Sequence, residues 1–144
     1  MRELLRLAAE RGLTVHAGHL EDGILGMYSP DEARIYFDIR LTPSERRSVL
    51  AHELGHAHYG HRCDTPATER QADIYAAQLL IDHAHYAEAA SINPDQHHIA
   101  EELGVTVDVI FTYETSCLTR VRGATYARPR LGAGQWAFRR AVAS

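Results

Sequence analysis

The sequence predicts an α+β fold, in which a helical body carries a small antiparallel sheet. Residues 24–28 and 34–39 have the short apolar pattern of two strands, and the turn signal Ser-Pro-Asp-Glu lies between them. The segments on both sides of these strands repeat apolar residues at helical spacing instead. A chain of 144 residues can bury a core without disulfide bonds, so we expect one domain.

The first element is expected to be a helix over residues 2–11, which Gly12 ends. The strand 34–39 should have one buried apolar face and one solvent-exposed polar face, because its residues alternate in polarity. The two faces are Ile35, Phe37 and Ile39 against Tyr36, Asp38 and Arg40. Such a strand could bind an extended peptide substrate by edge pairing.

The next helix has a strong start signal. Thr42 suits the N-cap, Pro43 suits the first helical position, and Glu45 completes a Thr-x-x-Glu capping box. We expect this helix to run to about Gly60. After a loop, a second helix is expected at about 67–83, because its apolar residues form one stripe. They are Ala72, Tyr75, Ala76, Leu79 and Leu80.

The break Ser-Ile-Asn-Pro-Asp precedes two further helices within about 96–118, which meet at Gly104. Their spacing is that of a helix-turn-helix-like element, with glycine at the turn. From Gly123 the chain is rich in glycine, arginine and small residues, and we expect it to be loosely structured until a short helix or strand at 134–142. These patterns predict a domain at 1–122 and a C-terminal tail at 123–144.

The charge of this tail differs from that of the rest of the chain. The net charge is -4, yet no Asp or Glu follows Glu114. The arginines beyond that point are Arg120, Arg122, Arg128, Arg130, Arg139 and Arg140. Phosphate contacts need a cationic surface, so the negative balance argues against a protein that mainly binds nucleic acid. The tail could contact DNA, but a solvated end is favoured.

The compartment is indicated by what the sequence does not contain. The N-terminus "MRELLRLAAERGL" lacks the apolar segment of a signal peptide, and no stretch approaches membrane-spanning length. The two cysteines, Cys63 and Cys117, do not make a disulfide framework. We therefore expect a cytoplasmic protein without a membrane partner.

The segment "HELGH" predicts a metal site on the capped helix. His52 and His56 are one helical turn apart, so both imidazoles can coordinate one cation. Glu53 is offset from His52 by about 100°, so it stands beside the metal, where it can accept a proton from an activated water. Zinc suits this His-Glu-x-x-His motif. The alternative is a surface helix with ordinary histidines.

A catalytic zinc ion needs a third protein ligand, and the segment "TERQADIYAAQLLI" offers one. Glu69 lies at the edge of the apolar stripe of the second helix. Asp73 is one turn further along the same face, where it could fix the tautomer of a ligand histidine. Alternatively, Glu69 is a first-turn acid that the helix dipole favours, and Asp73 is a solvated residue.

The remaining metal-capable side chains near the motif show no such pattern. His58 lies on another helix face than His56, and His61 follows Gly60, so both are expected at the surface. A second metal site or a contact with substrate is the alternative. Cys63 could bind a soft metal, but a carboxylate ligand is already available.

"HELGHAHYGH" followed by "ERQADIYAAQLLI" resembles the ImmA/IrrE family of metallopeptidases, whose active-site helices are similar to those of zincins. The resemblance extends over about residues 1–110. It implies one zinc ion with His52, His56 and Glu69 as ligands, Glu53 as general base and Asp73 as the residue that orients a ligand. The sequence departs from the family at Gln71, where Glu is frequent, and at Ile81-Asp82, which replaces a common Met-Pro.

The reaction implied is hydrolysis of a peptide bond, in which Glu53 moves the proton. The transition state needs a second oxyanion donor besides zinc. Candidates by chemistry are Tyr36, Tyr59, Tyr113 and His97. The resemblance implies a protein substrate, a helix-turn-helix transcriptional repressor of a phage or mobile element, which is cleaved at a specific site.

Two other functions stay open. One is a DNA-binding or partner-binding regulator that keeps a structural metal site. In such a regulator, the helix-turn-helix-like element would be the binding element. Asp108 and Glu114 make a recognition helix there unfavourable, since such a helix faces phosphates. The other is a zinc hydrolase that acts on a bond other than a peptide.

Overall fold

The computed structural model describes residues 1–121 and 124–127, with side chains up to residue 118. The chain divides into two compact units, Met1–Ala76 and Ala77–Ser144, which we describe separately. The first combines helices with a three-stranded sheet, so the predicted α+β fold class is confirmed. Among the described residues, no helix has the length and apolar character needed to cross a bilayer.

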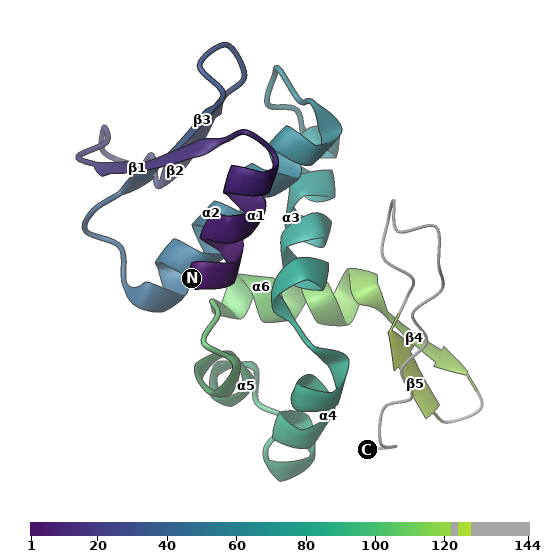
Figure 1. Cartoon of the computed structure of the whole chain (residues 1–144). Coiled ribbons are helices and arrows are strands. Elements are labelled where there is room, and N and C mark those ends of the chain that lie inside the picture. The colour runs from purple at the N-terminus through teal and green to yellow at the C-terminus, as the bar shows by residue number, and fades with distance from the viewer. Residues whose placement is uncertain (122–123, 128–144) are drawn as a thin grey trace. The chain divides into compact units, whose positions relative to one another are not determined.

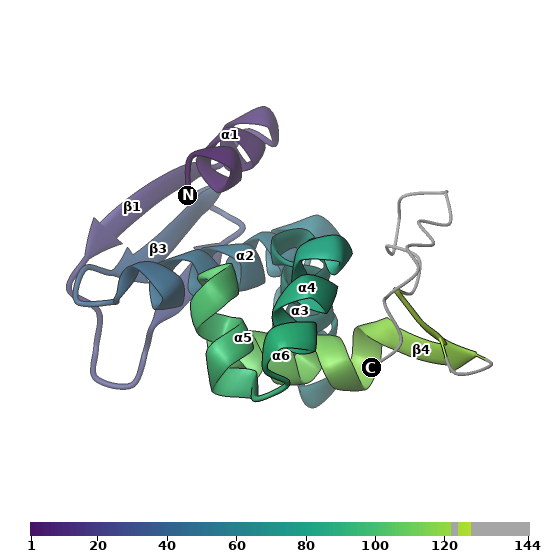
Figure 2. The same cartoon turned by 90° about the horizontal axis from the view of Figure 1, so that it is seen from below.

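The sheet of the first unit is mixed, with the order β1-β3-β2. Strands β2 (Gly26–Ser29) and β3 (Arg34–Asp38) form the predicted antiparallel pair, while β1 (Thr14–Gly18) pairs with β3 in parallel. Since β3 has a neighbour on each side, the edge pairing predicted for 34–39 is wrong, and the edge strands of this sheet are β1 and β2. Helix α1 (Arg2–Glu10) leads into β1, as Figures 1 and 2 both show.

Strand β3 follows the predicted alternation only in part. Ile35 and Phe37 are buried as expected, but Ile39 lies past the end of the strand and is exposed. Asp38, expected on the solvent-exposed face, is buried. Its carboxylate accepts hydrogen bonds from the guanidinium of Arg40 at 2.7 and 2.8 Å, so the buried charge is paired.

Helix α2 (Pro43–Tyr59) forms as the capping signal predicts. The Thr42 hydroxyl accepts a hydrogen bond from the Glu45 backbone at 3.2 Å, and the Glu45 carboxylate accepts one from the Thr42 backbone at 3.1 Å. Both bonds satisfy backbone groups that the first turn cannot pair internally. Leu50 and Leu54 are fully buried, and α2 contacts both β2 and β3. The packed face of α2 thus turns towards the sheet.

Helix α3 (Pro66–Leu80) lies very close to α2. A Cβ atom placed on Gly55 would stand 2.9 Å from the Cα of Ala72, closer than such atoms approach in proteins. The contact therefore requires glycine on α2, and Ala72, which is fully buried, presents only a small side chain in return. Helix α3 ends before the predicted His83, because Asp82 caps a separate helix.

The second unit is mainly helical. Its elements are α4 (His83–Ile92), α5 (Gln96–Leu103), α6 (Val107–Thr112), a π-helical turn (Tyr113–Cys117), β4 (Leu118–Val121) and β5 (Ala124–Ala127). The two predicted helices around Gly104 are α5 and α6. Strands β4 and β5 pair, so residues 124–127 are not loosely structured as predicted. The element predicted at 134–142 lies outside the described residues.

Candidate metal centre

The two histidines of the motif lie on one face of α2 and point to a common place. The Nε2 atoms of His52 and His56 are 3.1 Å apart, and the rings stand nearly perpendicular. His56 is buried, while His52 keeps 21% of its side-chain surface exposed. The separation of one helical turn thus brings two nitrogen ligands together, with one side left accessible.

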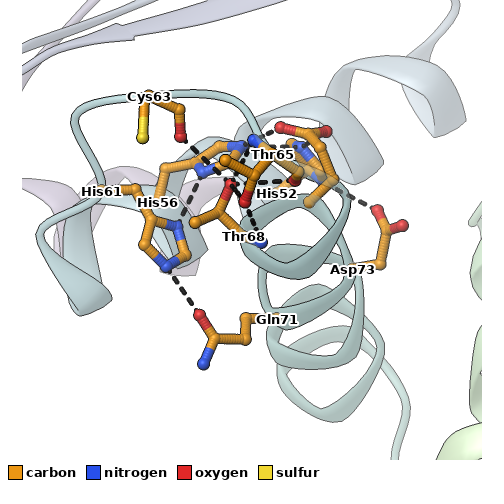
Figure 3. A network of polar contacts seen from close by, with 9 residues as sticks. His52, His56, His61, Cys63, Thr65, Thr68, Gln71 and Asp73 are labelled. Atoms are coloured by element: carbon orange, nitrogen blue, oxygen red, sulfur yellow. Dashed lines mark hydrogen bonds and ion pairs between the residues drawn. The ribbon is translucent and has the colours of Figure 1, made fainter.

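Glu69 reaches the same place from the first turn of α3. Its carboxylate oxygens lie 3.2 Å from His52 Nε2 and 3.0 Å from His56 Nε2. The hydroxyl of Thr65 accepts a hydrogen bond from the Thr68 backbone at 3.2 Å, which fixes the start of this helix (Figure 3). The structure therefore brings His52, His56 and Glu69 into one group that could hold a metal ion.

The donor set fits a zinc ion. The Nδ1 atom of His52 lies 2.8 Å from an Asp73 oxygen, so it carries the proton in that bond, and the lone pair of Nε2 faces Glu69. Two ring nitrogens and one carboxylate converge, and when both rings are neutral at Nε2 a cation stabilises this arrangement. In a tetrahedral zinc site with bonds of about 2.0 to 2.1 Å, ligand atoms stand roughly 3.3 Å apart. The spacings here, from 3.0 to 3.2 Å, are close to that value.

Asp73 and its neighbours change the basicity of His52. Burial lowers the pKa of His52, but the hydrogen bond to Asp73 and the negative charges of Glu53, Asp73 and Glu69 outweigh it and raise the pKa overall. The pKa of His56 is lowered, first by burial and then by the charge of His52. The Asp73 carboxylate thus lies next to one of the two candidate ligand histidines.

Glu53 is buried beside the ligand group. Burial raises its pKa to about 7, and the charges of Glu69 and Asp64 act in the same direction, against that of His52. The Tyr28 backbone hydrogen-bonds to its carboxyl group. A Cβ atom on Gly26 would lie 3.3 Å from Glu53 Oε1 and 2.3 Å from Val49 Cγ1. Strand β2 therefore runs directly against the proposed general base.

His61 was not predicted at the site, yet its ring contacts a proposed ligand. Its Nδ1 lies 2.9 Å from Nδ1 of His56, and its Nε2 lies 2.8 Å from Oε1 of Gln71 (Figure 3). His61 is half-buried, so it lies at the surface as predicted only in part, and its two ring contacts were not predicted. The available signal was Gly60, since a glycine after a helix returns the next residue over the last turn.

The four candidate oxyanion donors are placed differently. The hydroxyl of Tyr36 donates to Glu32 and accepts from Arg34 at 3.3 Å. The hydroxyl of Tyr59 is buried and has no hydrogen-bond partner among the described residues. In the second unit, the hydroxyl of Tyr113 lies 2.6 Å from His83 Nδ1, and His97 is exposed on α5.

Cys63 and His58 stand apart from the ligand group. Cys63 is exposed, and its carbonyl oxygen accepts a hydrogen bond from the Thr68 hydroxyl at 3.1 Å. His58 is exposed as predicted, and its ring stacks on Tyr75 with centroids 4.9 Å apart. The described contacts of Cys63 and His58 are a backbone hydrogen bond and a ring stack, and neither involves the candidate metal ligands.

Comparisons with known proteins agree with this geometry. The model of a peptidase family described as the IrrE N-terminal-like domain matches residues 8–111. A solved Mycobacterium tuberculosis transcriptional regulator has a similar fold, with a TM-score of 0.65 and 20% identity. The match covers 84% of this chain and 42% of that one, so this chain spans less than half the length of the regulator. No curated protein matches the chain.

Proposed function

The chain belongs to the peptidase family of the IrrE N-terminal-like domain, and from this premise we propose that it is a zinc-dependent endopeptidase. The observation that carries the proposal is the convergence of His52, His56 and Glu69, with Glu53 buried alongside. Two imidazoles and one carboxylate form a ligand set typical of catalytic zinc, and a free acid next to them is what hydrolysis requires.

Each residue has a defined part in this proposal. Bound zinc would supply Lewis-acid activation of the attacking water and of the scissile carbonyl. Glu53 takes the proton of the water at its carboxylate and hands it to the leaving amine. A divalent cation nearby favours the ionised form of Glu53 and so counteracts the raised pKa. Asp73 holds His52 in the tautomer that leaves Nε2 free to bind.

The substrate proposed is a helix-turn-helix transcriptional repressor of a phage or mobile element, cleaved in the cytoplasm. This specificity rests on the family resemblance. The place for an extended peptide is the free edge of β2, because that strand lies against Glu53. Among the oxyanion candidates, Tyr59 keeps a hydroxyl group that no described residue engages.

The test is the substitution Glu53→Gln, which keeps the size of the side chain but removes the base. We expect cleavage of the repressor to fall by about a hundredfold or more, because general-base catalysis contributes roughly that much. Zinc content should stay at one ion for each chain. Glu10→Gln, on an exposed position of α1, serves as the matched control and should cleave normally.

The outcome that would contradict the proposal is retained zinc with no cleavage of any repressor by the unsubstituted protein. That result would favour the regulator with a structural metal site. Helices α5 and α6 around Gly104 are the observation behind this second candidate. It requires DNA binding that weakens steeply with salt and disappears when residues 120–144 are deleted.

A further inference from the structure

We propose that His61 and Gln71 form a positioning relay, which holds the ring of His56 in the orientation and tautomer that metal binding requires. The inference rests on the proposed role of His56 as a metal ligand, but not on any protease activity. It assigns a function to two residues outside the ligand set, and it links the end of α2 to α3 on the side of His56 that faces away from Glu69.

The directions of the hydrogen bonds follow from the ligand assignment. If Nε2 of His56 binds the ion, its proton is on Nδ1 and must be donated. The acceptor is Nδ1 of His61, at 2.9 Å. His61 then carries its proton on Nε2 and donates it to Oε1 of Gln71, at 2.8 Å. The amide oxygen of Gln71 can only accept, so the N–H group of each of the two rings meets an acceptor (Figure 3).

The backbone holds His61 in place. The N–H of Gly60 bonds to the Ala57 carbonyl at 3.2 Å, and the N–H of His61 bonds to the His56 carbonyl at 3.0 Å. This pair of bonds is the Schellman motif, which folds the residue after the glycine back over the last turn. Gly60 has φ of 67°, a left-handed conformation that other residues adopt only with strain. The ring of His61 also stacks on Tyr59, with centroids 5.4 Å apart.

The position of His61 excludes a role as an additional ligand of the same ion. Its Nδ1 faces the Nδ1 side of His56, while Glu69 and His52 lie at the Nε2 side of that ring. The relay consists of a neutral imidazole and a neutral amide, whereas the partner of His52 is the carboxylate of Asp73. Glu53, Glu69 and Asp73 already place three carboxyl groups around the centre. An amide at position 71 completes the relay without adding a further carboxyl group.

The experiment compares metal binding by the full chain at one pH. The variants are His61→Phe, which removes the acceptor, His61→Asn, whose Oδ1 can replace Nδ1 as acceptor, and His58→Phe as the matched control. The zinc dissociation constant is measured by competition with a chelator, and the visible spectrum of the cobalt-substituted protein reports the geometry of the site. Far-UV circular dichroism checks that each variant is folded.

We expect His61→Phe to weaken zinc binding by about 10- to 100-fold, the usual effect of losing the partner of a ligand histidine. It should also change the cobalt spectrum. His61→Asn should recover most of the affinity, and His58→Phe should match the unsubstituted protein. Gln71→Leu should weaken binding less than His61→Phe, because it leaves the acceptor for His56 in place.

Nitrogen-15 spectra of the zinc-loaded protein test the tautomers directly. The relay requires His56 protonated at Nδ1 and His61 protonated at Nε2. Unchanged zinc affinity in His61→Phe, or a proton found on Nδ1 of His61, would overturn the proposal. A protein that binds zinc through this relay but cleaves nothing would leave the inference standing and refute only the peptidase proposal.

Discussion

His52 and His56 bind their partners through the same atom, Nδ1, but the two partners differ in charge. Asp73 offers His52 a carboxylate, and His61 offers His56 a neutral ring. A carboxylate partner strengthens the donor character of Nδ1–H and makes Nε2 more basic. The two proposed ligand histidines should therefore depend on their partners to different degrees.

Asp73→Asn tests this dependence at the residue scale. The amide oxygen can still accept from Nδ1 of His52, but the negative charge is gone, so zinc affinity should fall by about tenfold or more. A chelator competition assay measures the effect. Asp22→Asn replaces an exposed carboxylate and is the control. Equal affinity in both variants would mean that Asp73 does not tune the site.

A second residue-scale prediction concerns His83 in the second unit. Burial lowers its pKa below the usual value, and its Nε2 has no partner among the described residues. The unfolded chain therefore binds a proton more readily than the folded chain. Burial of the neutral His83 ring therefore makes no pH-dependent change to the free energy of unfolding above a pH of about 6.5. As the pH falls below that value, the free energy of unfolding should decrease.

Urea unfolding at several pH values measures this dependence. His83→Asn is the comparison, because its Oδ1 can accept from the Tyr113 hydroxyl but the side chain does not titrate. The other histidines contribute equally to both proteins, so only the difference between the two curves is informative. If that difference stays constant between pH 8 and pH 5, burial of His83 does not make stability pH-dependent.

The residues that the sequence could identify are those whose roles depend on local spacing. His52, Glu53 and His56 follow from one helical turn, and Asp73 follows Glu69 by another. Asp38 could not be placed from alternation, because its burial depends on a pairing with Arg40 beyond the strand. The ring contact of His61 depends on the reversal of the chain at Gly60, which helical periodicity does not describe.

At the scale of the elements, the separation between α2 and α3 determines whether the ligands meet. His52 and His56 belong to one helix and Glu69 to the other, and Gly55 is where the helices touch. A methyl group at this position meets the Ala72 backbone at 2.9 Å and the Tyr75 Cβ at 3.2 Å. Backbone atoms cannot rotate away, so one helix must move.

Gly55→Ala is therefore expected to reduce the free energy of unfolding by about 1 to 3 kcal/mol, the usual cost of overpacking. It should also weaken zinc binding, because the carboxylate moves away from the imidazoles. Denaturant unfolding and chelator competition measure the two effects. Gly18→Ala is the matched control, since its added Cβ meets nothing within 4 Å. Normal zinc affinity in Gly55→Ala would show that the helix spacing does not limit the site.

The elements differ in how well the sequence predicted them. Helix α2 has its own cap, and β2 with β3 forms a local hairpin, so nearby residues determine both. Strand β1 escaped prediction because it is mostly exposed and pairs in parallel with β3, twenty residues later. Parallel pairing joins segments that are distant in sequence and has no turn signal between them.

For the whole molecule, the proposed zinc site predicts stability that depends on metal. An ion that binds only the folded chain adds about 2.7 kcal/mol when its concentration is a hundred times the dissociation constant. The melting temperature should rise with added zinc and fall with a chelator. His56→Ala, which removes a ligand, should lose this response, while His58→Ala should keep it. An identical response in both variants would contradict the assignment of His56.

All proposed donors, the base and both partners of the histidines lie between His52 and Asp73, within the unit Met1–Ala76. One continuous stretch of the sequence thus holds the proposed metal ligands, the base and the partners of both histidines. For metal binding alone, a host scaffold would need two helices that approach as closely as Gly55 and Ala72 do. Residues 52–73 could therefore be transferred as one segment into an unrelated helical hairpin. We expect such a transfer to create a zinc-binding protein.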